Sequence, residues 1–280
     1  MEEQKKKGFL VSAVSFLLSL PYLFWLVIFT IIPMGLIVYF AITDQYGQFT
    51  LENLSQAGQY SPVLMQSILL SLVATAICIL VAYPLAFIMS RQTAHKKRTL
   101  LILVMLPMWM NFLLRTYSWM TILENNGLIN RFLSLFGIGP LTLINTQGAV
   151  ILGMVYNFIP FMIIPIYTVM IKIKTATLEA AQDLGAGWWQ IFSRVLLPLS
   201  MPGIRTGITL VFVPAVSTFI ISQMLGGSQL LIGDIIELQF LGSAYNPNLG
   251  AAISLVLMVL VLICMSVLNT FDDDSMEGML

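Results

Sequence analysis

The sequence predicts an all-α membrane protein with six transmembrane helices. Of its 280 residues, 58% are hydrophobic and only 9% are charged, whereas a soluble domain carries about 25% charged residues. Six apolar runs are each long enough to cross a hydrocarbon core about 30 Å thick. Lys and Arg gather in alternate segments between these runs, as they do in cytoplasmic loops. Too little polar surface remains for a water-soluble fold.

The first apolar run follows a polar N-terminal segment, residues 1–8, which carries three lysines. Residues 9–42 contain no charge, and as a helix they would exceed the length of one span. Pro21 predicts a division between an interfacial helix and a first span over 22–42. A lysine-rich start is also typical of a signal peptide, but this run continues past any small-residue cleavage site, so we expect an uncleaved anchor.

Polar or glycine-rich segments separate the other five apolar runs. The expected spans are 63–90, 99–123, 149–171, 204–225 and 249–271. Between the third and fourth spans, residues 128–136 predict a short interfacial helix. Residues 272–280 form an acidic tail.

Three prolines fall inside the fourth and fifth spans, at Pro160, Pro165 and Pro214. Each removes a helix hydrogen bond and predicts a bend, which makes these positions candidates for a gate. Membrane helices also tolerate proline without any such role.

The positions of the basic residues predict the orientation. Eleven of the thirteen Lys and Arg fall in the N-terminal segment, in 91–98 and in 172–205. Basic residues mark cytoplasmic loops, so six spans place both termini in the cytoplasm. The two exceptions are Arg115 and Arg131.

The longest amphiphilic stretch, 178–202, lies between the fourth and fifth spans. Thr177 is a candidate N-cap of a short helix there. Glu179 and Asp183 place negative charge near its start, where the helix dipole favours it. Gly185 is expected to end the helix, because glycine adopts the left-handed conformation of a C-terminal cap.

Gly187 is expected to take part in the same break, and a second helix follows from Trp188. Its apolar residues recur at helical spacing up to Leu196, and Pro198 predicts its end. The two helices are expected to lie beside the membrane rather than across it. Without further information, this is either an ordinary amphipathic connection or a docking element.

The pattern Glu179-Ala180-Ala181, followed by Gly185 and later by Leu197-Pro198, resembles the EAA loop of bacterial ABC-importer membrane subunits. In that family, the loop is a coupling helix that docks into a cleft on the ATPase subunit. The resemblance implies a coupling role for this loop. The candidate coupling residues are Glu179, Ala180, Ala181, Asp183 and Gly185.

A wider resemblance, to the spermidine/putrescine permeases, covers nearly the whole chain and weakens at both ends. The segments that carry it are 107–117, 184–186, 198–204, 214–215, 224–227, 230–236 and 239–241. It implies the type I ABC importer permease fold, with a permease domain over 9–271 and a coupling loop over 172–203. The implied partners are a second permease subunit, an ATPase dimer and an extracytoplasmic polyamine-binding protein. The implied location is a bacterial inner membrane.

The expected outer segments are acidic and aromatic. Acids paired with aromatic faces suit an organic polycation, although aromatic belts are also usual at membrane interfaces. The candidate residues of a substrate pathway are Trp109, Tyr117, Tyr156, Asp234 and Glu237.

Arg115 is the one formal charge well inside an expected span. A charge in such a position is a functional candidate by default. The alternative is that its side chain extends to the outer headgroups or pairs with Glu124. Because a fixed cation repels cations, Arg115 is not expected to bind a polyamine.

Several functions are excluded or disfavoured by what the sequence lacks. It has no phosphate-binding loop, metal cluster or nucleophile–base pair, so we expect no cofactor, no nucleic acid and ATP hydrolysis on another subunit. His95 is the only histidine, and Cys78 and Cys264 lie in apolar runs. An ion-coupled carrier is disfavoured because the expected spans contain no Asp or Glu. A different cargo, such as an amino acid, thiamine or ferric iron, stays open.

Overall fold

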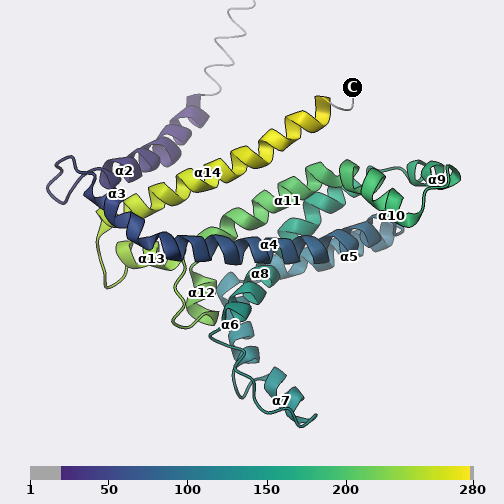
Figure 1. The fold of residues 1–280 in the computed structure, drawn as a ribbon, viewed down its shortest axis with the longest axis horizontal. Helices are drawn as coiled ribbons and strands as arrows, with labels where there is room; N and C mark the ends of the chain where they lie inside the picture. The colour runs from purple at the N-terminus through teal and green to yellow at the C-terminus, as the bar shows by residue number, and fades with distance from the viewer. Residues whose placement is uncertain (1–19, 278–280) are drawn as a thin grey trace, which may run out of the picture. The chain divides into compact units, whose positions relative to one another are not determined.

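The computed structural model describes residues 20–277, and the side chains of residues 20–267. Within this range the regular structure is helical, apart from one bridge between Thr43 and Phe49. Five helices are long and apolar enough to cross a membrane, and a bent pair provides a sixth crossing if it counts as one span. The predicted all-α membrane fold is confirmed (Figure 1).

The described residues form two compact units. The first contains residues up to Gln59 together with Gln239–Met258. Its helices are α2 (Ile32–Ala41), which continues the π-helical turn η1 (Val27–Ile31), α3 (Glu52–Ala57) and the beginning of α14 (Pro247–Glu277). The short 3₁₀ turn η2 (Gly58–Tyr60) follows α3.

A buried asparagine holds the first unit together. The Asn248 Nδ2 group donates to the Thr43 carbonyl at 2.7 Å and to the Phe40 carbonyl at 3.2 Å. Asn53 donates to the same Thr43 carbonyl at 2.8 Å. The loop after the first apolar helix is therefore fastened to the start of the last one.

The ends of the chain differ in part from the prediction. The first apolar helix runs over Leu20–Ala41, close to the expected 22–42. The interfacial helix expected before Pro21 lies almost entirely outside the described residues. Helix α14 continues to Glu277, so the acidic segment 272–277 extends the last helix.

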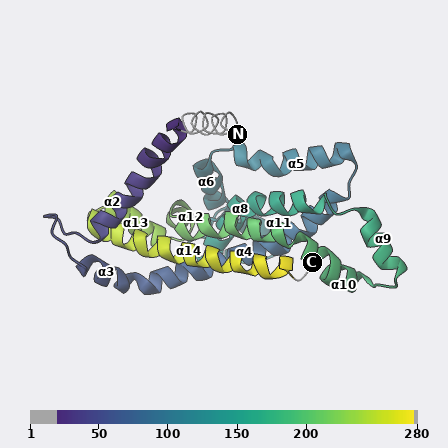
Figure 2. The same cartoon turned by 90° about the horizontal axis from the view of Figure 1, so that it is seen from above.

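The second unit is built on three long helices: α4 (Ser61–Ser90), α8 (Gln147–Met170) and α11 (Leu197–Ser217). They pack side by side, as both views show (Figures 1 and 2). Small residues allow the close approach, which is how helices associate where lipid removes the hydrophobic drive. A Cβ atom added at Gly203 of α11 would lie 2.8 Å from the Pro165 carbonyl oxygen of α8.

The expected third span, 99–123, is not one continuous helix. It divides into α5 (Ala94–Trp109) and α6 (Phe112–Leu123), and the run Phe112–Ser134 that begins with α6 lies at 89° to α5. The Asn111 side chain caps α6 by accepting hydrogen bonds from the backbone N–H groups of Leu113 at 2.8 Å and Leu114 at 3.4 Å. A new helix start is therefore encoded inside the apolar run. Helix α7 (Leu128–Ser134) follows.

The expectation that Pro198 ends a helix is wrong. Helix α10 (Trp188–Ile191) passes through the π-helical turn η3 (Phe192–Leu196) into α11 without a break. The Leu197 N–H donates to the carbonyl of Phe192, five residues back. This widened turn directly precedes Pro198, and such turns are a recognised way for a helix to change its hydrogen-bond register.

The fifth span also ends earlier than expected. Thr218 is extended, and the residues up to 225 belong to a separate helix, α12 (Ile220–Leu225), followed by α13 (Ile232–Phe240). The backbone of Gly233 approaches the end of α11 so closely that an added Cβ would lie 2.5 Å from the Thr218 carbonyl oxygen. The apolar helical run is therefore Trp188–Val216 rather than 204–225.

Replacing Gly203 by valine should separate α11 from α8, because the added atoms meet backbone rather than flexible side chains. We expect a loss of about 1–3 kcal/mol of stability, measured as a lower midpoint of thermal unfolding in detergent. The matched control is Gly35→Val in α2, where an added Cβ meets nothing within 4 Å. Equal effects of the two substitutions would contradict the packing described.

Candidate coupling site

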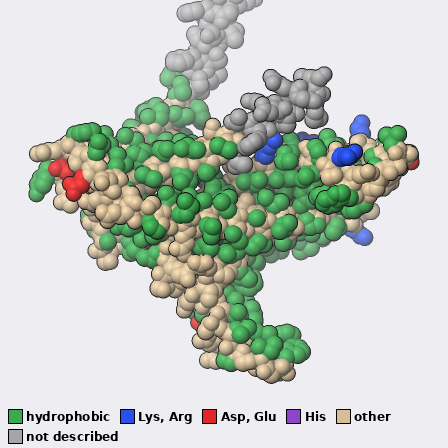
Figure 3. All heavy atoms as spheres, viewed as in Figure 1, with side chains coloured by type: hydrophobic (Ala, Val, Ile, Leu, Met, Phe, Trp, Pro, Cys, Tyr) green, Lys and Arg blue, Asp and Glu red, His purple; other side chains and the backbone are tan. Residues whose placement is uncertain are grey.

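The segment between α8 and α11 folds into a helical knuckle formed by α9 (Thr175–Asp183) and α10. It lies at one end of the second unit (Figure 1). Lys and Arg side chains gather toward that end (Figure 3). Helix α9 begins two residues before the predicted N-cap Thr177, with Lys174 as the preceding residue. Thr177 is therefore inside the helix and caps nothing.

The turn after α9 has the geometry of a Schellman motif. Gly185 has φ of 80°, in the left-handed region. Its N–H donates to the Gln182 carbonyl at 2.8 Å, and the Ala186 N–H donates to the Ala181 carbonyl at 3.0 Å. These two bonds satisfy carbonyls that the helix end leaves free. The predicted helix-ending role of Gly185 is confirmed.

Gly187 has a different role from the one expected. Its φ of −70° is accessible to any residue, so this position does not require the conformational freedom of glycine. It precedes α10, and its N–H donates to the Gln190 Oε1 atom at 2.9 Å. The link between the two helices is thus a short, hydrogen-bonded turn.

The tip of the knuckle presents exposed groups. Leu184 is 88% exposed, and Glu179, Ala180 and Asp183 are also exposed. Between the two helices is a hollow of 360 Å³ with mixed polar and apolar walls. Its lining residues are Ala181, Leu184, Gly185, Ala186, Gln190, Arg194 and Val195. An exposed leucine beside carboxylates suits docking to another protein better than contact with water alone.

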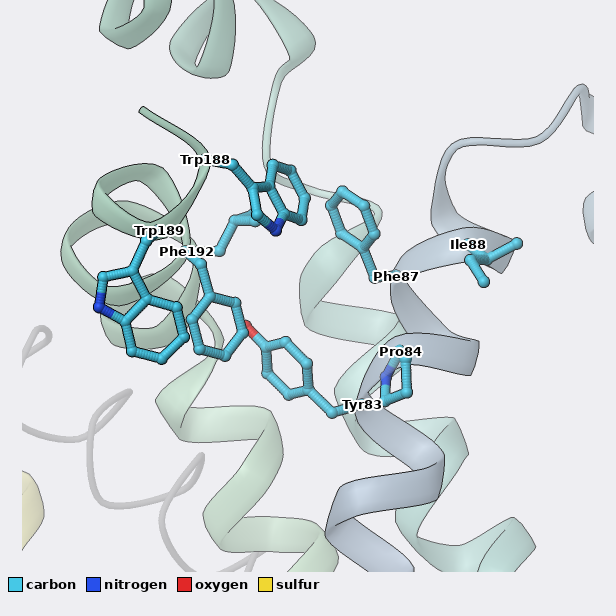
Figure 4. Close-up of a pocket in the computed structure, with 8 residues that line it drawn as sticks. Tyr83, Pro84, Phe87, Ile88, Trp188, Trp189 and Phe192 are labelled. Carbon is cyan, nitrogen blue, oxygen red and sulfur yellow. The ribbon is translucent and has the colours of Figure 1, made fainter. Parts of the chain in front are cut away.

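Aromatic side chains fix one root of the knuckle to α4 (Figure 4). The Tyr83 and Phe192 rings meet edge to face at 5.5 Å, and the Phe87 and Trp188 rings do so at 5.7 Å. The Tyr83 hydroxyl also lies 3.1 Å from the Ser200 hydroxyl. Aromatic pairs of this geometry stabilise by about 0.5–1.5 kcal/mol each beyond their buried area.

An arginine fixes the other root to the same helix. The Arg91 Nη1 group, at the end of α4, donates to the Ile173 carbonyl at 3.1 Å, just before α9. Its guanidinium also lies 5.5 Å from the centre of the Phe87 ring. Burial lowers the pKa of Arg91 from its ordinary value. The chain segments at both ends of the knuckle are therefore held against the C-terminal end of α4.

The expected pathway residues are only partly brought together. Tyr156 of α8 packs edge to face against Trp119 of α6 at 5.3 Å. Trp109 and Tyr117 are exposed on α5 and α6. Among the described contacts, no hydrogen bond or ring pairing joins these aromatic residues to the acids of α13.

The two acids of α13 form a separate polar cluster with α12. Asp234 is 0% exposed, and its Oδ2 atom accepts a hydrogen bond from the Leu231 N–H at 2.6 Å. Its Oδ1 atom has no hydrogen-bond partner among the described residues. Gln223 donates to Glu237 at 3.3 Å. Burial raises the pKa of Asp234, while the Leu231 N–H and the nearby Ser222 side chain oppose the rise.

Arg115 does not extend to the surface. It is 7% exposed, its guanidinium lies 5.8 Å from the Phe112 ring centre, and the described residues show no ion pair with Glu124. Its Nε and Nη1 atoms have no partner within the described part of the chain. Both explanations by headgroup contact or Glu124 pairing therefore find no support in this structure.

Sequence reasoning did not find the clasp formed by Arg91, Tyr83, Phe87 and Ser200. Tyr83 and Phe87 stand in an apolar run in which any aromatic residue looks like core or lipid-facing surface. The one available signal was their separation of four residues, which places them on one face of a helix.

A comparison with protein families identifies the class of protein to which this chain belongs. Residues 3–273 match the family described as "Binding-protein-dependent transport system inner membrane component". The chain belongs to this family. It is therefore a multi-pass inner-membrane component of a transport system rather than an enzyme, and the predicted class is confirmed.

Curated relatives of this transport component agree over most of its length. It is 40% identical over 248 residues to the spermidine/putrescine transport system permease protein PotB of Haemophilus influenzae, covering 85% of this chain and 86% of that one. Identity to PotB of Escherichia coli strain K12 is 38%, covering 85% and 90%. Identity to the inner membrane ABC transporter permease protein YdcU of the same strain is 31%, covering 71% and 68%.

Solved structures share the fold of this component. One is a crystal structure of a bacterial ABC transporter that imports the acidic polysaccharide alginate, with a TM-score of 0.73 at 19% identity, covering 97% of this chain and 99% of that chain. Another is the MetNI methionine ABC transporter, with a TM-score of 0.53 at 19% identity, covering 79% and 95%. The type I ABC importer permease fold is confirmed.

Replacing Phe192 by alanine should loosen the knuckle, since its ring contacts both Tyr83 and Trp189. Loss of two aromatic pairs costs about 1–3 kcal/mol, which should raise the rate of trypsin cleavage after Arg194 about tenfold. The control is Leu184→Ala at the exposed tip, which should leave cleavage unchanged. Unchanged cleavage of the Phe192 variant would contradict the clasp.

Proposed function

We propose that this chain is the permease subunit of an ATP-driven polyamine importer that takes up spermidine or putrescine. The assignment of polyamine as the cargo rests on the 40% identity to a spermidine/putrescine permease along 85% of the chain. The acids of α13 are compatible with a cationic cargo, because carboxylates attract donor-rich ammonium groups.

The chain works as one of several subunits. It pairs with a second, related permease to form the translocation pathway, and an ATPase dimer hydrolyses ATP on the inner side. An extracytoplasmic binding protein delivers the polyamine. Both termini lie in the cytoplasm, since the predicted inner segments hold eleven of the thirteen basic residues.

The α9–α10 knuckle is the coupling element. Glu179, Ala180, Ala181, Asp183 and Gly185 contact the ATPase, together with the exposed Leu184. Since α10 continues into α11 and α4 clasps both roots, movement of the tip is transmitted to the spanning helices as a rigid body.

Competition for uptake tests the cargo. Vesicles containing the purified importer and its binding protein should take up labelled spermidine or putrescine only with ATP inside. Unlabelled polyamine should compete, whereas amino acids, thiamine and ferric iron should not. Uptake of one of those other cargoes in place of polyamine would overturn the cargo assignment but not the proposed role as a permease subunit.

The exposed carboxylate of Glu179 provides a test of coupling. Glu179→Lys should reduce uptake about tenfold or more, because reversing a charge at a docking site places like charges together or leaves its partner unpaired. The protein should remain in the membrane, and ATP hydrolysis should lose its stimulation by the loaded binding protein. Uptake is measured in cells beside the amount of inserted protein.

Thr177→Lys is the matched control for that charge reversal. It places a lysine on α9 two residues away, on the other side of the helix. Uptake should persist in this variant. If both variants transport normally, α9 does not dock through the face that carries Glu179.

Asp234 provides a test of the polar cluster in α13. Asp234→Asn removes the negative charge without changing the side-chain shape, and a charged hydrogen bond contributes about 1.5–3 kcal/mol. We expect the maximal rate of spermidine uptake to fall about tenfold. The concentration for half-maximal uptake should stay the same, because the binding protein sets it.

Glu124→Gln is the control for Asp234→Asn, since Glu124 is an exposed acid in another segment. It should transport normally. Normal maximal uptake by Asp234→Asn would show that this buried acid takes no part in passage of the cargo.

A further inference from the structure

An apolar stripe on α7 and the turn after it is left uncovered in the described structure. Its members are Leu128, Phe132, Leu135 and Phe136, which are between 60% and 79% exposed. Their spacing of four, seven and eight residues places them on one face of a helix. The Phe132 and Phe136 rings meet edge to face at 5.2 Å. Hydrophobic side chains lie along one side of this projecting end of the unit in Figure 3.

The stripe cannot turn inward, because the other side of α7 is fastened. The buried Asn130 side chain donates to the carbonyls of Glu124 at 3.1 Å and Leu141 at 2.9 Å. It also accepts a hydrogen bond from the Leu141 N–H at 2.9 Å. Ile129, which borders the stripe, packs against the hydrophobic core. No residue in the described part of the chain therefore covers the stripe.

The direction of the preceding helices indicates where that neighbour lies. Helix α5 begins with the basic residues 95–98, and its apolar part, residues 99–109, has a length of about 16 Å. It therefore ends just inside the outer half of a hydrocarbon core about 30 Å thick. There the run Phe112–Ser134 begins, at 89° to α5. A segment at right angles to a spanning helix runs along the membrane plane, so α6 and α7 lie at the level of the outer leaflet.

The one basic residue of α7 completes the pattern. Arg131 is exposed, lies in the last turn of the helix and flanks the stripe. It is one of only two basic residues outside the expected inner segments. An apolar face bordered by a cation is typical of helices that lie in a lipid interface, where the cation meets phosphate.

We propose that α7 is an in-plane membrane helix whose stripe is buried in lipid of the outer leaflet, with Arg131 at the level of the phosphates. The helix then fixes the depth of the outer end of the bent third span. This role does not depend on the identity of the cargo. A partner protein covering the same stripe is the alternative that the experiment must distinguish.

Spin labelling distinguishes a lipid neighbour of the stripe from a protein neighbour. The natural cysteines are removed as Cys78→Ala and Cys264→Ala, and one label is attached through Leu135→Cys in the importer assembled with its native subunits. The assembly is placed in vesicles of phosphatidylethanolamine and phosphatidylglycerol. Collision rates are measured with oxygen, which concentrates in lipid, and with a water-soluble nickel chelate. Phe136→Cys on the same stripe gives an independent second reading.

We expect oxygen to reach both stripe labels several-fold more readily than nickel does. The matched control, Ser134→Cys, lies next to Leu135 but on the polar side of α7, and should show the opposite ratio. Ready access of nickel to both stripe labels would place the stripe in water. Low access of both reagents would place it against a protein. Either result would overturn the proposal.

Discussion

The packing of α11 against α8 and α4 is the interaction on which the rest of this structure depends. Its close approach requires Gly203, whose added Cβ would meet the α8 backbone. Because α10, η3 and α11 form one helical run, this packing also sets the direction in which the knuckle leaves the membrane. A side chain at Gly203 would therefore disturb the packing of the long helices and the position of the knuckle together.

The knuckle combines a rigid root with an exposed tip. Arg91 and the Tyr83–Phe192 pair hold the two roots against a single helix, α4. The Schellman turn at Gly185 fixes the tip, and Leu184 projects from it. An element that transmits motion between subunits needs this combination, since a loose root would absorb the displacement.

Polar groups inside this chain are few and are placed with local partners. Ser67 accepts a hydrogen bond from the Ile232 N–H at 2.8 Å, which joins α4 to the start of α13. Asn157 of α8 donates to the carbonyl of Gly153 at 2.9 Å. Arg91, Arg115 and Asp234 are the charged residues that keep buried polar atoms without a hydrogen-bond partner among the described residues, and the Asn157 Oδ1 atom is likewise unpaired. Unsatisfied buried charges are costly, so these three charged positions are ones at which function is expected to outweigh stability.

The sequence alone determined the membrane-protein class, the approximate extent of most apolar helices and the loop with the Glu-Ala-Ala pattern. Apolar runs, basic segments and the Glu-Ala-Ala pattern are local signals, which can be recognised in the sequence without knowledge of tertiary contacts. The left-handed glycine at 185 was likewise predictable, because helix termination is a property of neighbouring residues. The continuity of the helix through Pro198 was not, since a π-helical turn accommodates that proline in the folded chain.

Only the tertiary structure decided which of these elements act together. It ended α11 at Ser217 and brought Tyr83 and Phe87 beneath the knuckle. It also separated the aromatic pathway candidates from the acids of α13. Such outcomes depend on contacts between residues distant in sequence, such as Tyr83 with Ser200 or Arg91 with Ile173. In a chain that is apolar throughout, hydrophobic pattern distinguishes core from lipid-facing surface poorly, and packing decides between them.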